Sequence, residues 1–364
     1  MAEYDFDTVL SLKNLDRRRF LKFCGQMAAA LGLSQSFIPQ IANAIEKVSK
    51  RTSIVWLHFA SDTGCTESVI KTTHPSASEI VLDILSIDYH ETIMAAAGEQ
   101  SEEILKKSIE EGGYILIVEG GVPTKPGYGR IGRRDMMDIL KETSSKAAAI
   151  IALGSCATYG GVPAARPNPA GIKGVGEFLQ RPVINLSGCP VNPDWLVATV
   201  VHHLLFGKLP ELDKHGRPKI IYGMNIHDNC PRRASFDAGK FVEEFGSEDA
   251  MEGECLYKMG CKGPNTYANC PLIRWNDKIS WCVQSGYGCT GCTEPGWPDA
   301  FSPMRAVLPG ISIPVFKGVE TTADKIGAAL GVATAAGIGI HLAASAMKGR
   351  IKKDEEKEKS QNSI

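Results

Sequence analysis

The sequence predicts an α/β protein in which a helix-covered parallel sheet is followed by a smaller irregular domain and a terminal membrane helix. From Thr52 to about Gly207, apolar runs of strand length alternate with helical patterns, the signature of a parallel sheet wrapped by helices. From His227 onward this periodicity gives way to short segments rich in glycine, proline and cysteine. Residues 326–347 contain no charged side chain and are long enough to cross a bilayer.

The expected sheet domain, residues 52–215, contains five strand-like runs and three clear helices. Short apolar runs predict strands at 53–59, 114–120, 147–154 and 182–188, with a further strand at 81–89. Amphipathic patterns predict helices at 101–112, 133–146 and 195–206. Glycine pairs follow two of the strands but lack the spacing of a phosphate-binding loop. The irregular domain is expected to span 216–315.

Composition excludes a nucleic-acid-binding function. The 364 residues include 40 basic and 41 acidic side chains, so the chain has no electrostatic footprint for a phosphate backbone. Ordinary apolar and charged fractions, 43% and 22%, predict a globular protein rather than a disordered one. Of the 11 cysteines, all but Cys24 lie between Cys65 and Cys292. The cysteines therefore belong to the folded body.

The N-terminus resembles a twin-arginine export signal with a small-residue cleavage site. Residues 16–22 read DRRRFLK, a weakly apolar stretch follows at 23–38, and Ala42-Asn43-Ala44 comes next. This order predicts a signal peptide at 1–44 that is cleaved near Ala44. The alternative is a basic helix start followed by a short amphipathic helix. The resemblance implies export of a folded protein that has already received its cofactor.

The uncharged run 326–347 is expected to form a single membrane helix. Its alanine and glycine content leaves a buried helix of a soluble protein as the alternative. Basic residues follow at 348, 350, 352 and 353, which predicts a cytoplasmic tail at 348–364 and a body on the outer, periplasmic or extracytoplasmic, face of the cell membrane. His341 within the run is either a proton-related or haem-related residue or a packing histidine.

A first group of cysteines follows the predicted strands. Asp62-Thr63-Gly64-Cys65 comes after the first strand, and Cys156 and Cys189 come at the ends of the runs 147–154 and 182–188. Ligands of an open α/β sheet gather outside the carboxyl ends of its strands, so these residues are expected to converge on one point. Neighbouring glycines would let the backbone approach a bulky group.

Two further groups lie in the irregular domain. One combines an imidazole with three thiolates, and its members are His227, Cys230, Cys255 and Cys261. The other has four thiolates, from Cys270, Cys282, Cys289 and Cys292. Either set can hold an iron-sulfur cluster or a structural zinc, and disulfides are a third reading for an exported protein. A histidine in ligand spacing and cysteines in glycine-rich turns favour metal, and several clusters in line would indicate electron transfer.

Eight stretches around these residues match a known family. They read TGCTES (63–68), HP (74–75), GSCATYGG (154–161), GCPVNP (188–193), HDNCPRR (227–233), CLYKMGCKGP (255–264), NCP (269–271) and CTGCTEP (289–295). Together they resemble the small subunit of membrane-bound nickel-iron hydrogenases over essentially the full chain. The resemblance implies a flavodoxin-like first domain and a second domain that holds iron-sulfur clusters.

The resemblance also implies a function. The chain would relay electrons from dihydrogen oxidation, at the nickel-iron centre of a partner large subunit, through three iron-sulfur clusters. The acceptor would be a membrane cytochrome b or another quinone-linked carrier. No catalytic residue is expected in this chain.

The resemblance also implies which residues are the ligands of each cluster. Those of the proximal cluster, nearest the nickel-iron centre, are Cys65, Cys156 and Cys189. Those of the distal cluster are His227, Cys230, Cys255 and Cys261. Those of the medial cluster are Cys270, Cys289 and Cys292.

The sequence departs from the family pattern at two ligand positions. Asp62 stands where the family has the first cysteine of C-x-G-C, so its carboxylate is expected to complete a proximal 4Fe-4S cluster; the alternative is a three-cysteine site. Cys282 stands where the family commonly has proline, so it can turn a medial 3Fe-4S cluster into 4Fe-4S; the alternative is a packed free thiol. Gly64 and Gly161 replace two extra cysteines that the family links with oxygen tolerance, so that device is absent.

Two other functions remain open from the sequence. One is an iron-sulfur oxidoreductase subunit related to the proximal-cluster subunit of quinone reductases, and the second and third cysteine groups count against it. The other is a non-redox exported binding protein held by disulfides or zinc. Glu67, close to Cys65, is expected to make a structural hydrogen bond, with a place at the subunit interface or on a proton route as the alternative.

Overall fold

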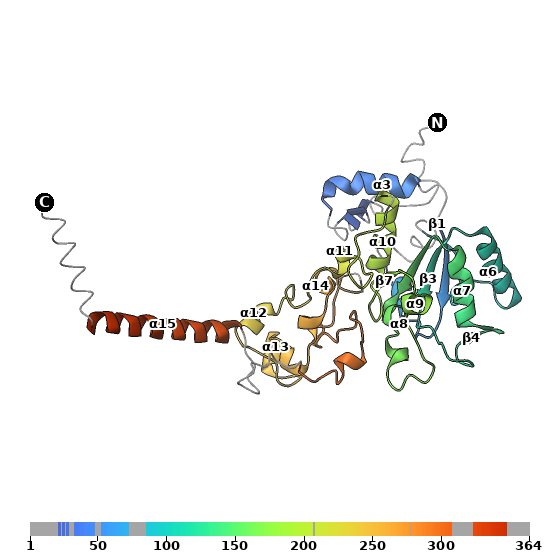
Figure 1. Ribbon diagram of the computed structural model, residues 1–364. Helices are drawn as coiled ribbons and strands as arrows, with labels where there is room; N and C mark the ends of the chain where they lie inside the picture. The colour runs from blue at the N-terminus through green and yellow to red at the C-terminus, as the bar shows by residue number, and fades with distance from the viewer. Residues whose placement is uncertain are drawn as a thin grey trace.

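A five-stranded parallel sheet forms the centre of the first domain (Figure 1). The computed structural model describes residues 33–47, 52–72, 85–307 without 207 and 277, and 323–347, with positions 21, 22, 24, 25, 27 and 28. The strands are β1 (Thr52–His58), β2 (Leu85–His90), β3 (Ile115–Glu119), β6 (Ala149–Leu153) and β7 (Ile184–Leu186). Their spatial order is β2-β1-β3-β6-β7, which is the flavodoxin-like order, so the predicted fold is confirmed.

Alternating side chains of the strands build two cores, one on each face of the sheet. Leu116 and Val118 of β3 pack on the face covered by α6 (Glu99–Glu111), α7 (Met136–Lys146) and α9 (Val175–Leu179). Ile115 and Ile117 point to the other face, against α10 (Pro193–Phe206) and the second domain. Because neighbouring residues of a strand face opposite ways, a sheet covered on both faces needs uninterrupted apolar runs. This is why the strands were recognisable in the sequence.

Most predicted elements of the sheet domain are confirmed, with one corrected boundary. The helix expected at 133–146 begins only at Met136, because Arg134–Asp135 (β5) pairs with Arg130–Ile131 (β4) in a short antiparallel ribbon. The strand expected at 81–89 runs from Leu85 to His90, and residues 81–84 lie outside the described part of the chain. Two short helices that the sequence analysis missed carry cysteines: α4 (Gly64–Ile70) and α8 (Gly154–Tyr159).

The second domain is irregular, as expected. Its helices are single turns or little more: α11 (Lys219–Tyr222), α12 (Arg233–Asp237), α13 (Glu248–Glu252), α14 (Cys270–Ile273), η4 (Tyr257–Met259), η5 (Gly263–Asn265) and η6 (Asp299–Phe301). Such short elements bury little backbone, so side-chain networks and bound groups have to hold the domain together.

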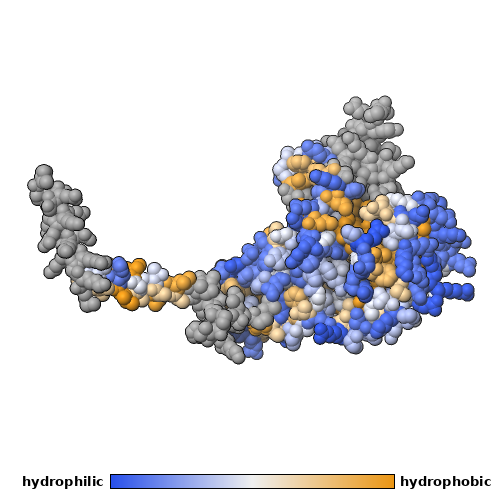
Figure 2. Space-filling view, viewed as in Figure 1, coloured by the Kyte–Doolittle hydropathy of each residue, from blue (hydrophilic) through white to orange (hydrophobic). Residues whose placement is uncertain are grey.

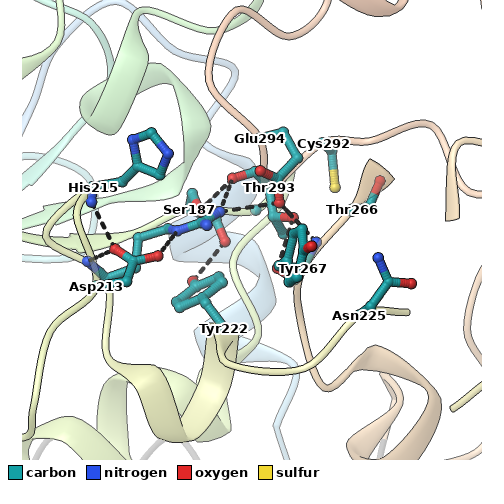
Figure 3. A network of polar contacts seen from close by, with 12 residues as sticks. Ser187, Asp213, His215, Tyr222, Asn225, Thr266, Tyr267, Cys292, Thr293 and Glu294 are labelled. Carbon is teal, nitrogen blue, oxygen red and sulfur yellow. Dashed lines mark hydrogen bonds and ion pairs between the residues drawn. The ribbon is translucent and has the colours of Figure 1, made fainter. Parts of the chain in front are cut away.

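One such network joins the two domains around Arg217, which is only 3% exposed. Its guanidinium donates to Asp213 at 2.8 Å, to Glu294 at 3.1 Å and to the Thr293 carbonyl at 3.0 Å, and lies 5.0 Å from the ring centre of Tyr222. Figure 3 shows this network beside Cys292, with Ser187 of the sheet domain bonded to the same Thr293 carbonyl at 2.8 Å. The segment that follows Cys292 is therefore fixed to the sheet domain.

The N-terminal region packs on the body. The helix α3 (Ile38–Lys47) lies across α10 (Figure 1), preceded by the short turn η1 (Gln35–Phe37). Cys24, Met27 and Ile41 are buried at 0–1% exposure in the same core as α10. The cleavage site predicted near Ala44 falls inside α3, and residues 1–20, with the paired arginines, lie outside the described residues.

The chain ends in one long apolar helix, α15 (Ala323–Met347), which extends away from both domains (Figure 1). Residues 329–346 are apolar enough to cross a membrane, and none of this window is buried. Figure 2 shows apolar side chains exposed along the helix. The helix contains the predicted span 326–347. Its apolar window is exposed, which contradicts the alternative of a buried helix of a soluble protein. The predicted tail 348–364 lies outside the described residues.

Candidate iron-sulfur sites

The first group of cysteines converges at the carboxyl ends of three strands. Cys65 lies in α4 after β1, Cys156 lies in α8 after β6, and Cys189 follows β7. The cysteines lie close to the backbone of neighbouring glycines. A Cβ atom at Gly154 would lie only 2.5 Å from the Cys65 sulfur, so no larger residue fits there. Gly161 has the same role beside Cys156, whose sulfur lies 3.0 Å from where a Cβ would be.

Asp62 lies beside this group. Its Oδ1 accepts the Gly64 N–H at 3.0 Å, and a Cβ at Gly64 would lie 2.9 Å from the same oxygen. The Asp62 carboxylate is close enough to raise the pKa of both Cys156 and Cys189; burial has the larger effect on both thiols, and the Cys189 thiol also has a larger effect on Cys156. The structure therefore brings Asp62 and three thiols to one place, with Asp62 at the exposed edge.

The second group surrounds a small cavity of about 20 Å³. His227, Cys230, Cys255 and Cys261 all line it. The His227 ring is held edge-on against Phe236, with ring centres 4.5 Å apart. Burial lowers the pKa of His227, which favours the neutral ring that binds metal. All four residues of the predicted set are brought together.

The third group lines a larger cavity of about 730 Å³. Its members Cys270, Cys282, Cys289 and Cys292 all contact this space, and Cys189 of the first group reaches it from the sheet domain. Cys270 and Cys289 are buried, whereas Cys282 is on the exposed side. The cavity is also lined by Trp281, a core residue that is 4% exposed and directly precedes Cys282.

The three groups form a series, with the third between the other two. Cys189 is within electrostatic range of the Cys292 thiol, which links the first group to the third. Ser155 strengthens this link, because its hydroxyl donates to the Cys292 carbonyl and accepts the Gly188 N–H at 3.0 Å. The Cys289 N–H donates to the Cys261 sulfur at 3.2 Å, which links the third group to the second.

Known proteins are similar to this chain over nearly its full length. The family of the C-terminal part of NiFe/NiFeSe hydrogenase small subunits matches residues 222–305, and the family of the 20 kDa subunit of NADH ubiquinone oxidoreductase matches residues 63–203. The chain is 44% identical to the quinone-reactive Ni/Fe-hydrogenase small chain of Wolinella succinogenes, over 93% of this chain and 98% of that protein. It is 46% identical to the uptake hydrogenase small subunit of Cupriavidus necator, over 96% and 97%.

The chain belongs to the nickel-iron hydrogenase small subunits. A periplasmic NiFe hydrogenase small subunit from Solidesulfovibrio fructosivorans is 47% identical over 82% of this chain and 96% of that protein. The reduced Ni-Fe-Se hydrogenase structure from Desulfomicrobium baculatum superposes with a TM-score of 0.67 at 37% identity, over 71% of this chain and all of that chain. This hydrogenase subunit therefore transfers electrons from the large subunit, and the match at 222–305 separates it from the quinone-reductase relatives, which share the first domain.

The chemistry of the three groups fits iron-sulfur clusters, the cofactors typical of hydrogenase small subunits. The ten cysteines from Cys65 to Cys292, all of which the structure describes, form no disulfide with one another, so the disulfide alternative is wrong. Among the residues described, no three His, Cys, Asp or Glu side chains are close enough to hold one metal ion. Ligands of a cluster stand farther apart than ligands of a single ion, because several irons and sulfides separate them.

Burial makes these sites unfavourable for bare thiolates. It raises the pKa of Cys65 well above its usual value, that of Cys156 to about 12 and that of Cys189 to about 11. In the other groups, burial raises the pKa of Cys292 to about 12 and that of Cys255 to about 11. Thiolates in such places need positive charge beside them, which iron supplies.

Glu119 is a site residue that the sequence analysis missed. At the end of β3 it is 1% exposed, and its carboxylate accepts the Cys65 N–H at 3.1 Å, the Thr66 N–H at 3.2 Å and the Trp56 indole N–H at 3.2 Å. It thereby fixes the first turn of α4, which carries Cys65. A charged residue ending the apolar run 114–120 was the signal that could have identified it.

Among the described residues, the Glu67 side chain has no hydrogen-bond partner, so the structural hydrogen bond expected of it is not seen there. Its side chain is 56% exposed, and its carboxylate lies 3.8 Å from the Lys71 ammonium on the next turn of α4. Glu67 also lines the large cavity, together with Lys71. Such an exposed ion pair adds little stability.

Proposed function

We propose that this hydrogenase small subunit holds three iron-sulfur clusters in the order proximal, medial, distal, between the large subunit and a membrane electron acceptor. The proximal cluster is held by Asp62, Cys65, Cys156 and Cys189. The medial cluster is held by Cys270, Cys282, Cys289 and Cys292, and the distal cluster by His227, Cys230, Cys255 and Cys261. When bound, each cluster takes up and releases one electron at a time.

The serial arrangement of the ligand groups is the observation that carries this proposal. Ser155, next to Cys156, donates to the Cys292 carbonyl, and the Cys289 N–H donates to the Cys261 sulfur, so hydrogen bonds join neighbouring groups at or beside their ligand residues. Buried hydrogen bonds of this kind hold the groups at fixed separations. An electron then needs no motion of the chain to pass from the first group to the last.

The carboxylate of Asp62 is proposed as the fourth proximal ligand. Its position next to Gly64, and its electrostatic effect on Cys156 and Cys189, support this role. Oxygen is a harder ligand than sulfur and is expected to change the cluster's reduction potential. Cys282 faces the same cavity as the three medial cysteines and is proposed as the fourth medial ligand.

Replacement of each proposed extra ligand tests these two assignments. In the purified complex, Asp62→Ala should lower the cluster iron, counted apart from the iron of the nickel-iron centre, from about twelve to about eleven per small subunit and produce a three-iron signal in electron paramagnetic resonance. Cys282→Ala should do the same at the medial site. Asp62→Cys should keep all irons. Glu103→Gln, an exposed change on α6 away from all three groups, should leave the spectrum unchanged.

An unchanged iron content and spectrum in Asp62→Ala would mean that Asp62 is not a ligand. A three-iron signal already present in the unmodified complex, and unaltered by Cys282→Ala, would mean that Cys282 is a free thiol.

The body is proposed to lie on the outer face of the cell membrane, anchored by α15. Relatives named periplasmic and quinone-reactive, together with the exposed apolar surface of this helix, support this location. Residues 1–44 are proposed as the export signal, 52–215 and 216–315 as the two domains, and 348–364 as a cytoplasmic tail. The acceptor beside α15 is proposed to be a cytochrome b or another quinone-linked carrier.

A further inference from the structure

Lys262 is a buried cation for which the described residues provide no carboxylate partner. The residue is 2% exposed, and its ammonium donates to the Ala306 carbonyl. Within the described part of the chain, no Asp or Glu lies within ion-pair distance of it. Burying a charge without a counter-charge is strongly unfavourable, because one carbonyl replaces only part of the lost hydration. An anionic group is therefore needed to complete the surroundings of Lys262.

The position of Lys262 indicates which anionic group this is. Lys262 directly follows Cys261, and its backbone N–H donates to the Cys289 carbonyl at 2.6 Å. The Cys261 sulfur in turn accepts the N–H groups of Cys289 at 3.2 Å and of Gly263 at 3.4 Å. The Lys262 ammonium is within electrostatic range of this sulfur. The buried cation thus lies at the junction of the second and third cysteine groups, next to a ligand of the second.

We propose that the Lys262 ammonium is the counter-charge of the distal cluster and raises its reduction potential. This inference rests on the proposed assignment of Cys261 as a distal ligand. Reduction adds one electron to the cluster and breaks no bond, so the negative charge at the site grows by one. A fixed cation in a buried environment stabilises the reduced form over the oxidised form. Electrons arriving from the medial group are then held at the last site before the acceptor.

Charge and hydrogen bonding at Lys262 can be separated by substitution. Lys262→Gln keeps a donor for the Ala306 carbonyl but removes the charge, Lys262→Met removes both, and Lys262→Arg keeps both. Lys258→Gln is the matched control, because Lys258 lies on η4 between two distal ligands but is 37% exposed and pairs with Glu243 at 2.6 Å. Each variant is made in the full complex and poised at a series of potentials, and the distal signal is followed by electron paramagnetic resonance.

We expect both neutral variants to lower the reduced-to-oxidised ratio of the distal cluster, at the wild-type midpoint, on the order of tenfold. Lys262→Arg should restore the wild-type ratio, and Lys258→Gln should change it much less, because water screens an exposed charge. Loss of the distal cluster alone in both neutral variants, with all clusters retained in Lys262→Arg, would also support the proposal. The cation would then be needed for that cluster to be held at all.

A wild-type ratio in Lys262→Gln, with a shift only in Lys262→Met, would overturn the proposal and leave Lys262 as an anchor for the Ala306 carbonyl. Equal cluster loss in all three Lys262 variants would also overturn it, since retaining the charge would then make no difference. Cys261→Ser distinguishes this failure from failure of the ligand assignment. An unaltered distal signal in Cys261→Ser would overturn both, whereas a wild-type ratio in Lys262→Gln would overturn only the role of Lys262.

Discussion

At the scale of single residues, buried acids control how stability depends on pH. Burial raises the pKa of Glu91 to about 7 from its ordinary 4.5, although the His58 N–H at 2.6 Å partly offsets this. A raised pKa in the folded state means that the stabilising contribution is complete below pH 4.5 and is lost as pH rises through 7. The neutral acid is the form that the fold prefers.

Glu91→Gln should therefore stabilise the protein above pH 7 by roughly 1–3 kcal/mol and have little effect at pH 4.5. Glutamine can still accept the His58 N–H, so the fold is retained. Urea unfolding of the purified complex at the two pH values measures the difference. Glu103→Gln, an exposed change on α6, is the control. An equal gain at both pH values would show that ionisation of Glu91 is not the cause.

Arg217 is a residue whose loss should be costly. Its partners Asp213 and Glu294 have side chains only 18% and 11% exposed, so removal of the guanidinium leaves two carboxylates largely out of water. Arg217→Met should lower the free energy of unfolding by about 3–5 kcal/mol. Lys219→Met breaks the exposed pair with Glu211 nearby and should cost less than about 1 kcal/mol. Chemical denaturation compares the two, and similar losses would contradict this account.

Only some of the important residues could be identified from the sequence. The cysteine groups could be predicted because strand ends and short spacings bring ligands together. Glu119, Arg217 and Lys262 could not, because a lone charge becomes important only when the fold buries it. Neither its neighbours in sequence nor any periodicity indicates that burial.

At the scale of elements, α3 is held to the body by one apolar face. Ile41 is fully buried and Ala42 is 5% exposed, while Gln40 on the same helix is exposed. Ile41→Glu should release α3 from α10, since a buried unpaired carboxylate is more costly than the lost contact. In the uncleaved chain, trypsin should then cut after Lys47 several-fold faster. Gln40→Glu adds the same charge on the exposed face and should not change the rate.

The helix α15 should be sufficient to explain membrane attachment. Leu330, Val332 and Ile340 are 63–71% exposed, which is unfavourable in water and favourable in lipid. Deletion of residues 323–364 should move the complex from the membrane to the soluble fraction without loss of its clusters. Hydrogen-dependent reduction of a soluble dye should persist, whereas reduction of the membrane acceptor should fall. A truncated complex that still sediments with membranes would show that another surface holds it there.

The strands and long helices could be predicted from their apolar patterns, but the short helices could not. The helices α4 and α8 span only 64–70 and 154–159, too short for a helical period to be seen beside glycines and cysteines. The β4–β5 ribbon was also too short to be recognised, because each strand has two residues and β5 lies in the charged start of the helix expected at 133–146.

At the scale of the whole molecule, the sheet, the irregular domain and α15 position a series of buried ligand sites. The first group is supported by three strand ends, the third by the Arg217 network and Ser155, and the second by the contact of Cys261 with Cys289. Each support is a hydrogen bond or a packed strand end rather than a flexible linker. The arrangement suits transfer of electrons over a fixed route from the large subunit towards the membrane.

The most direct test is iron, sulfide and metal analysis of the anaerobically purified complex, combined with electron paramagnetic resonance of samples poised over a range of potentials. We predict about twelve cluster irons and as many acid-labile sulfides per small subunit, in addition to the iron of the nickel-iron centre, with three separate cluster signals and no three-iron signal. Zinc in these sites without sulfide would contradict the electron-transfer assignment of the ligands. A three-iron signal in the unmodified complex would contradict full ligation by Asp62 or Cys282 while leaving the serial route intact.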